Sequence, residues 1–114
     1  MQKIITEKIG GKVIILLQDD LDASDQRLTR RWQSPRQANQ EYFVWIDCSS
    51  LNCVKSLGFS HFVSQLLLLK QAQANITLLN LSNHQQELLR LLRVEHLFTV
   101  VPDFEKAYQL VQAS

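Results

Sequence analysis

Residues 42 to 59 read Tyr42-Phe-Val-Trp-Ile-Asp-Cys-Ser-Ser-Leu-Asn-Cys-Val-Lys-Ser-Leu-Gly-Phe59, and this stretch decides the expected fold. Its first part, Tyr42 to Asp47, is an apolar run of aromatic and β-branched residues, which predicts a buried strand. A short loop follows, and a long apolar pattern from Phe59 to about Gln73 predicts a helix. A strand followed by a helix is the unit from which sheets with parallel strands are built.

The residues before this stretch predict a hairpin. Gln2 to Ile9 has the mixed polarity of an edge strand, and Lys12 to Leu17 has the continuous apolar character of a central strand. Gly10-Gly11 between them supplies the positive φ angles of a tight primed turn. We therefore expect a sheet that contains an antiparallel pair at one side.

The remaining residues continue the alternation of strands and helices. Further elements are expected as helices over residues 23–33, 83–92 and 103–112, the last two capped by Asn83 and Asp103, and as strands over residues 75–81 and 98–101. The expected fold class is α/β, one domain over residues 1–114, with a mixed β-sheet of about five strands. The helices should pack chiefly on one face, and Val13–Leu17 and Phe43–Ile46 should be adjacent in the centre.

The composition limits the class of protein. Of the 114 residues, 46% are hydrophobic and 20% are charged, which is typical of a soluble globular domain. The formal net charge of +1 gives no global field toward nucleic acid or an anionic membrane. No apolar run approaches the roughly 18 to 20 residues of a membrane helix, and the charged N-terminus does not resemble a signal peptide. We expect a cytoplasmic protein without nucleic-acid binding or membrane insertion.

Clusters of reactive side chains lack the spacing of a catalytic or metal site. Cys48 and Cys53 form a C-x4-C pair, which is neither a redox pair nor a zinc half-site, so two reduced and partly buried thiols are expected. The histidines fall on different predicted elements: His61, His84 and His96. No glycine-rich phosphate loop is present. We expect no metal, no cofactor and no enzymatic activity.

Two charged clusters have structural interpretations. Four aspartates precede the first expected helix without the glycine and terminal glutamate of a calcium loop: Asp19, Asp20, Asp22 and Asp25. Four arginines fit a solvated helix end better than a nucleic-acid patch, although Trp32 stands among them: Arg27, Arg30, Arg31 and Arg36. Their order, acids first and bases after, complements the helix dipole.

Ser56 is the residue that raises the question of function. It stands between the strand and the long helix, where we expect the first turn of that helix and therefore the positive end of its dipole. That end favours an added anion, so phosphorylation would not unfold the domain. Serine is also a common helix cap, and from local sequence alone capping is the more common explanation.

The long helix has an inner and an outer side. At about 100° per residue, the inner side carries Phe59, Phe62, Val63 and Leu66. His61, Ser64 and Leu68 fall on the opposite side. Leu68 is then an apolar residue that points away from its own core and extends a docking surface.

Several short motifs together resemble the STAS domain, the fold of bacterial anti-sigma factor antagonists. Leu21-Asp22 resembles its G-x-L-D turn, and Trp45-Ile-Asp-Cys-Ser-Ser-Leu51 its strand ending in Asp. Val54-Lys-Ser-Leu-Gly-Phe59 lines up with its D-S-S-G-L signature, and Leu91-Leu-Arg-Val-Glu-His-Leu-Phe98 with its L-x-x-x-G-L-x-x-x-F segment. Four positions depart from the pattern: Asp19 and Arg93 replace glycines, Lys55 replaces the aspartate, and Leu57 replaces the second serine.

The resemblance implies a regulatory binding domain. In the family, the serine that matches Ser56 is phosphorylated by a serine protein kinase that is also an anti-sigma factor, and a phosphatase is a further expected partner. The expected partner-binding residues are Asp22, Lys55, Ser56, Leu57, Gly58, His61 and Leu68. The alternative is a STAS-like subunit that docks on a membrane transporter or signalling scaffold without phosphorylation. We expect a monomer or a weak dimer.

Overall fold

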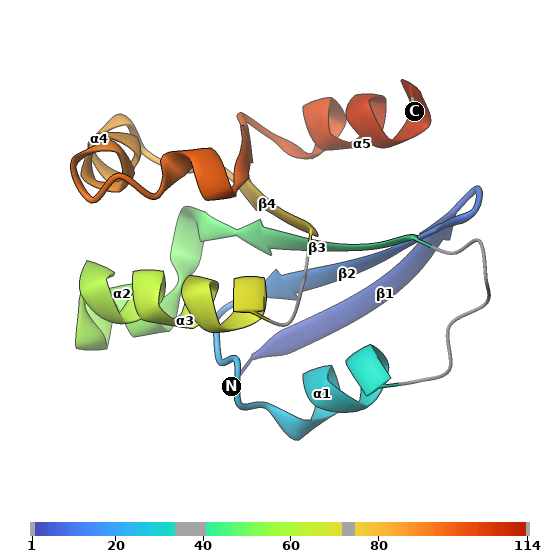
Figure 1. Cartoon of the computed structure of the whole chain (residues 1–114), viewed down its shortest axis with the longest axis horizontal. Coiled ribbons are helices and arrows are strands. Elements are labelled where there is room, and N and C mark those ends of the chain that lie inside the picture. Colours follow the sequence, from blue (N-terminus) through green and yellow to red (C-terminus); the bar gives the residue numbers. More distant parts are fainter. Residues whose placement is uncertain (1, 34–40, 72–74, 114) are drawn as a thin grey trace.

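The sheet of the computed structural model has five strands in the order β1-β2-β3-β4-β5 (Figure 1). The structure describes residues 2–33, 41–71 and 75–113. The strands are β1 Lys3–Ile9, β2 Lys12–Gln18, β3 Glu41–Asp47, β4 Asn75–Leu79 and β5 Thr99–Val101. β1 runs antiparallel to β2, and the other neighbouring pairs are parallel. The expected mixed sheet is confirmed.

Five helices connect and follow the strands. They are α1 Gln26–Gln33, α2 Asn52–Leu57, α3 Phe59–Gln71, α4 Asn83–Leu91 and α5 Phe104–Ala113, with the short 3-10 turns η1 Cys48–Ser50 and η2 Glu95–Leu97. The sequence did not predict α2 or either 3-10 turn. Within the described ranges, no helix is long and apolar enough to cross a membrane.

The hairpin between β1 and β2 has a two-residue loop, because Ile9 pairs directly with Lys12. Of its two glycines, Gly10 alone has a positive φ, 61°. The expectation that both glycines supply positive φ is therefore wrong, and the turn has the pattern of a type II′ turn. The predicted centre of the sheet is confirmed, since β2 pairs with β3 along Val13 to Leu17.

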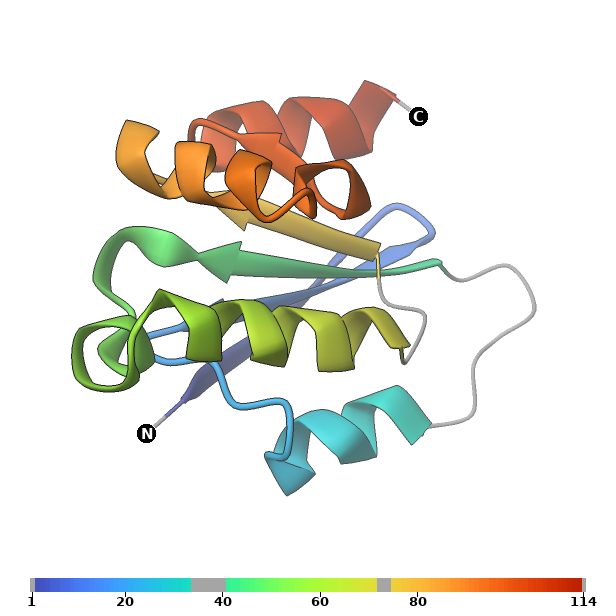
Figure 2. The same cartoon turned by 60° about the vertical axis from the view of Figure 1, so that its left-hand side comes forward.

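The two faces of the sheet carry two unequal cores. Ile15, Leu17, Val44 and Ile46 point into the larger core, to which α1, α2, α3 and α4 all contribute buried side chains. The alternate residues Ile14 and Trp45 point to the other face, where α5 covers them with Ala107 and Val111. Figures 1 and 2 show α1 and α3 on one side of the sheet and α5 on the other. The helices thus lie chiefly on one face, as predicted.

Local capping sets the ends of three helices. Asp103 caps α5 as predicted, since its carboxylate accepts from the N–H of Lys106 at 2.9 Å. The cap of α4 is Ser82, one residue before the predicted Asn83. Ser82 and Gln85 form a reciprocal capping box. α1 begins at Gln26 and not at residue 23, because Asp25 accepts from the second N–H of the helix.

Both cysteines are buried free thiols, in agreement with the sequence prediction. Burial raises the pKa of the Cys48 thiol, with a further contribution from the nearby Asp47 charge. Burial also raises the pKa of Cys53, to about 11, and its hydrogen bond with Asp20 acts in the same direction. At neutral pH both side chains are therefore protonated and weakly nucleophilic.

Candidate functional site

Ser56 lies in the last turn of α2, a helix of 6 residues that precedes α3. Its hydroxyl donates to the carbonyl of Asn52 at 2.9 Å, and the side chain is exposed. α3 begins only at Phe59, after Gly58, whose φ of 91° separates the two helices. The prediction that Ser56 stands in the first turn of the long helix, or caps it, is therefore wrong.

This position changes the electrostatic argument about Ser56. The last turn of a helix is the negative end of its dipole, so α2 does not favour an added anion there. The effect of so short a helix is small, and Lys55 next to Ser56 is an exposed cation that opposes it. The structure thus shows Ser56 as an exposed residue at a helix end and not at the positive end of a helix dipole.

The loop after β2 holds the start of α2 in place. The carbonyl of Asp19 accepts from the N–H of Asn52, and the carboxylate of Asp20 accepts from the N–H of Cys53, both at 3.0 Å. Burial by itself would raise the pKa of Asp20, but hydrogen bonds from Leu21 and Cys53 outweigh it and lower that pKa below its ordinary value. α2 is thus capped by residues more than thirty positions away, for which no local sequence signal exists.

Asp22 belongs to the same loop. Its carboxylate accepts from the N–H and the hydroxyl of Ser24, and its own N–H donates to the side chain of Gln2. The neighbouring N–H of Ala23 donates to the side chain of Gln65 on α3 at 2.7 Å. The loop therefore contacts both α2 and α3.

The outer side of α3 follows the predicted helical phase. Leu68 is 51% exposed and Ser64 is exposed, whereas Phe62, Val63 and Leu66 are buried. The prediction that Leu68 points outward is confirmed. His61, which the same phase places outside, is half-buried. We call the surface formed by Asp22, Lys55, Ser56, Leu57, Gly58, His61 and Leu68 the α2–α3 face.

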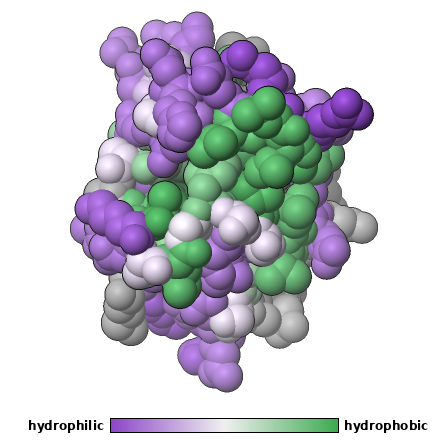
Figure 3. Space-filling model, turned by 90° about the vertical axis from the view of Figure 1, so that its left-hand side faces the viewer, coloured by the Kyte–Doolittle hydropathy of each residue, from purple (hydrophilic) through white to green (hydrophobic). Residues whose placement is uncertain are grey.

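Exposed leucines continue the apolar character of this end of the molecule. Leu57 at the end of α2 is exposed, and so are Leu91 and Leu92 at the end of α4. Figure 3 looks onto the end where α2 and α4 lie, and it shows hydrophobic side chains gathered in one area beside a hydrophilic one. The sequence analysis missed Leu91 and Leu92. They precede the left-handed Arg93, which the sequence does not mark with a glycine, so no local signal was available.

Asp47 closes the carboxyl end of β3 with a structural network. Its carboxylate accepts from the N–H and hydroxyl of Ser49, from Asn80 and from Gln18. Burial opposes ionisation, but these hydrogen bonds together lower the pKa of Asp47. Among the residues with described positions, no three potential ligands come together in a way that could hold a metal ion. The hydrogen bonds of Asp47 therefore hold the loops at this edge of the sheet together.

Two residues that replace family glycines have left-handed backbones. Asp19 has a φ of 69° and Arg93 a φ of 59°. Arg93 follows α4: its N–H bonds to the carbonyl of Arg90, and the N–H of Val94 bonds to that of Leu89. That pattern is the Schellman helix end, in which glycine is usual at the position of Arg93. The backbone of Arg93 thus has a conformation in which glycine is the usual residue.

Comparison with known proteins gives a family and a fold. The STAS domain family model matches residues 3–107 of this chain. The structure is similar to that of an anti-sigma-factor antagonist (STAS) domain protein from Planctomyces limnophilus, with a TM-score of 0.56 and 17% identity over 97% of this chain and 98% of that one. It is also similar to the protein TM1081, with a TM-score of 0.52 and 12% identity over 96% and 88% of the two chains. No curated protein matches the sequence significantly.

Proposed function

The chain belongs to the STAS domain family, and on that premise we propose that it is a regulatory binding protein that docks on an anti-sigma serine kinase through the α2–α3 face. Docking would release the sigma factor that the kinase holds. The observation that carries the proposal is the exposed Ser56 hydroxyl in the last turn of α2, next to the exposed Leu57. The proposed role is one of binding and not of catalysis.

Phosphorylation of Ser56 would switch the docking off. The hydroxyl has a single hydrogen bond to release, to the carbonyl of Asn52. A phosphate adds about 1.5 to 2 negative charges at neutral pH. Next to Leu57 that charge must be desolvated when a partner docks, and desolvating an unpaired charge weakens binding. A phosphatase would restore the docking state.

Hydrogen bonds hold the backbone of the α2–α3 face in place, which favours docking. The loop containing Asp22 contacts α3 through the N–H of Ala23, and α2 through the bonds of Asp19 and Asp20. The backbone that carries Ser56 is therefore fixed before a partner arrives. Preorganisation of this kind reduces the ordering cost of binding.

A second candidate function follows from the residues beside Ser56. Lys55 and Leu57 replace the family aspartate and second serine, and a kinase shaped for an acidic neighbour would meet a cation instead. The exposed Leu57 and Leu68 supply apolar contact without any phosphate. The chain would then be a subunit that docks on a membrane transporter or a larger signalling complex.

Phosphosite mapping tests the first function. The chain is incubated with ATP and an anti-sigma serine kinase from the same organism, and mass spectrometry locates the phosphate. We expect label on Ser56, none in the Ser56→Ala variant, and full label in the matched control Ser60→Ala. The variant Ser56→Asp should bind the kinase at least about tenfold more weakly than the parent, since one buried unpaired charge costs that much or more.

Two results decide between the functions. Phosphate on Ser49, Ser50 or Ser60 with none on Ser56 contradicts the assignment of the site. Absence of any label, together with equal kinase affinity of parent and Ser56→Asp, contradicts the kinase switch and favours the second function.

A further inference from the structure

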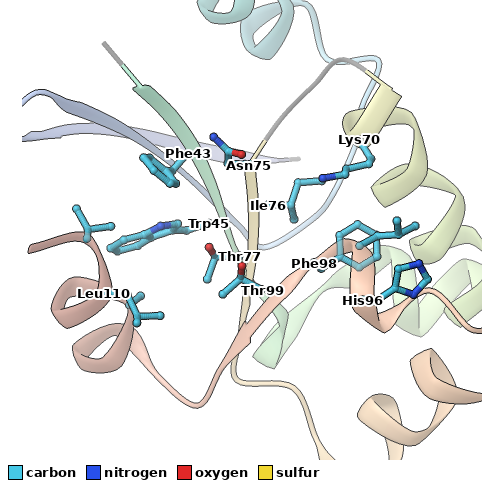
Figure 4. A pocket seen from close by; sticks show the side chains of 13 residues that line it. Phe43, Trp45, Lys70, Asn75, Ile76, Thr77, His96, Phe98, Thr99 and Leu110 are labelled. Carbon is cyan, nitrogen blue, oxygen red and sulfur yellow. The ribbon is translucent and has the colours of Figure 1, made fainter. Parts of the chain in front are cut away.

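A hollow of about 610 Å³ lies at the edge of the sheet beside α5, away from the α2–α3 face (Figure 4). β5 pairs with β4 only from Thr77 to Leu79, so the first residues of β4 have no strand beside them on that edge. α5 bounds the resulting notch on one side, and η2 and the end of α3 bound it on the other. Its size falls in the range of small-molecule sites, about 300 to 1,000 Å³. We call it the β4 notch.

Two buried hydrogen-bond donors of the notch have no protein partner. Trp45 is 2% exposed and Thr77 is 8% exposed. Neither the indole N–H of Trp45 nor the hydroxyl of Thr77 has an acceptor among the residues that the structure describes. In those same residues, every fully enclosed side-chain nitrogen or oxygen does have a partner. Both donors therefore reach solvent, and the hollow that they line is the route.

A tryptophan N–H as deeply buried as that of Trp45 normally has a protein acceptor. Because this donor and the Thr77 hydroxyl both reach solvent, neither is an enclosed unsatisfied group. Trp45 turns its ring edge-to-face against Tyr108 on α5, with centroids 5.1 Å apart. That contact holds the indole ring without using its N–H.

The ionisable side chains that line the notch are basic. Its ionisable lining groups among the described residues are Lys70 and His96, and no carboxylate lines it. Figure 4 shows the Lys70 side chain extending from α3 toward Asn75 and Ile76 at the start of β4. Lys70 has no ion-pair partner in the described part of the chain. The site thus presents a cation and donors, and it lacks an anion.

Apolar side chains form the rest of the wall. Phe43 comes from β3, and Leu110 and Val111 come from α5. Phe43 and Leu110 lie on the side of the notch where Trp45 and Thr77 also lie (Figure 4). Ile76 and Phe98 lie on the side of Lys70 and His96, so both parts of the hollow have apolar walls and one of them carries the ammonium group of Lys70.

We propose that the β4 notch binds a small carboxylic acid with an aromatic or branched apolar body. The apolar body packs against Phe43 and Leu110, beside Trp45 and Thr77, and the carboxylate lies toward Lys70, which supplies the opposite charge. A carboxylate offers acceptors only, which suits a lining that has a lysine ammonium and no carboxylate. The inference is independent of the docking function, because its residues lie outside the α2–α3 face.

A matched pair of probes tests the chemistry. Hydrocinnamate and hydrocinnamyl alcohol share a phenyl body and differ in charge, and each is titrated into ¹⁵N-labelled protein. Hydrocinnamate should shift the indole N–H resonance of Trp45 and the amides of Thr77 and Thr99. The alcohol should bind more weakly, by about three- to fivefold, because it cannot use the charge of Lys70.

Variants separate the contribution of the Lys70 charge to binding from that of the cavity walls. Lys70→Gln should lower hydrocinnamate affinity by about three- to fivefold and leave the alcohol unchanged, with the same melting temperature as the parent. Lys106→Gln removes an exposed α5 lysine outside the notch and should change neither affinity. Trp45→Phe reduces the aromatic wall and should weaken both the acid and the alcohol.

Three outcomes would overturn the proposal. One is equal affinity for acid and alcohol, and another is an equal loss of acid affinity in Lys70→Gln and Lys106→Gln. The third is the absence of shifts at Trp45 and Thr77 at millimolar acid.

Discussion

The α2–α3 face and the β4 notch leave opposite groups unsatisfied. On the face, Asp20 and Ser56 are hydrogen-bonded within the chain, while the apolar side chain of Leu68 is exposed. In the notch, the apolar walls are packed, while the donors of Trp45 and Thr77 are left without partners. An exposed apolar area gains from burial against another protein, whereas unpaired donors in a hollow gain from a small acceptor.

One strand serves both sites. Along β3, Val44 and Ile46 point into the core beneath α3, and Phe43 and Trp45 point to the α5 side. The period of two residues in a strand produces this division. Changes on one face can therefore be made without touching the other, which allows the comparison to be tested.

The largest expected effect comes from Asp20→Ala. Removing this carboxylate leaves the N–H groups of Leu21 and Cys53 without their acceptor. We expect the free energy of unfolding to fall by about 1 to 3 kcal/mol. Kinase docking should weaken because α2 loses its anchor, while hydrocinnamate binding at the β4 notch should stay at the parental value. Urea unfolding and the two titrations measure these quantities.

The pH dependence of the same residue supplies a control. The pKa of Asp20 is lower in the folded protein than its ordinary value of 3.8. The carboxylate therefore contributes stability above pH 3.8, and this contribution is lost as the pH falls below that value. The difference in stability between parent and Asp20→Ala should shrink in acid. A difference that stays constant down to pH 2 would mean that the variant acts through packing alone.

The sheet could be predicted from sequence because its signals are local. The glycine pair of the hairpin and the apolar run Tyr42–Asp47 each lie within a few residues. α2 could not be predicted, because its first N–H groups bond to Asp19 and Asp20, far away in the chain. Because these non-local hydrogen bonds support a separate helix α2, Ser56 lies at a helix end and not at the predicted helix start.

The candidate sites differ in the same way. Leu68 was predictable, since helical periodicity alone turns it outward. The notch was not, because it depends on the shortness of β5 and on the packing of α5 over Trp45. The left-handed backbones of Asp19 and Arg93 were hidden by their side chains, since glycine is the residue whose presence would have marked them.

An intermediate effect is expected from Arg93→Gly. The left-handed backbone costs a residue with a side chain more than it costs glycine. We expect the variant to raise the free energy of unfolding by about 0.5 to 1 kcal/mol. Arg90→Gly, in the last turn of α4, should instead lower it by about 1 kcal/mol. A thermal melt of both variants distinguishes relief of strain from a general effect of losing an arginine.

The same variant also tests whether the two sites are separate. Arg93 follows the exposed Leu91 and Leu92 and precedes η2, whose His96 lines the notch. If the sites are independent, Arg93→Gly leaves hydrocinnamate affinity unchanged. A change of more than about threefold would show that the end of α4 couples them through η2, and the comparison between the two sites would then fail.

The smallest effect on stability, and the sharpest on function, is expected from Leu68→Glu. An exposed substitution typically changes stability by within about 0.5 kcal/mol, and Leu68 is 51% exposed. The new charge on the α2–α3 face should nevertheless weaken docking, because a partner that covers Leu68 would have to desolvate it. Gln109→Glu adds the same charge at an exposed position of α5 and should leave docking unchanged. Equal docking by both variants would place the docking surface elsewhere, and a melting temperature many degrees lower for Leu68→Glu would place Leu68 in the core.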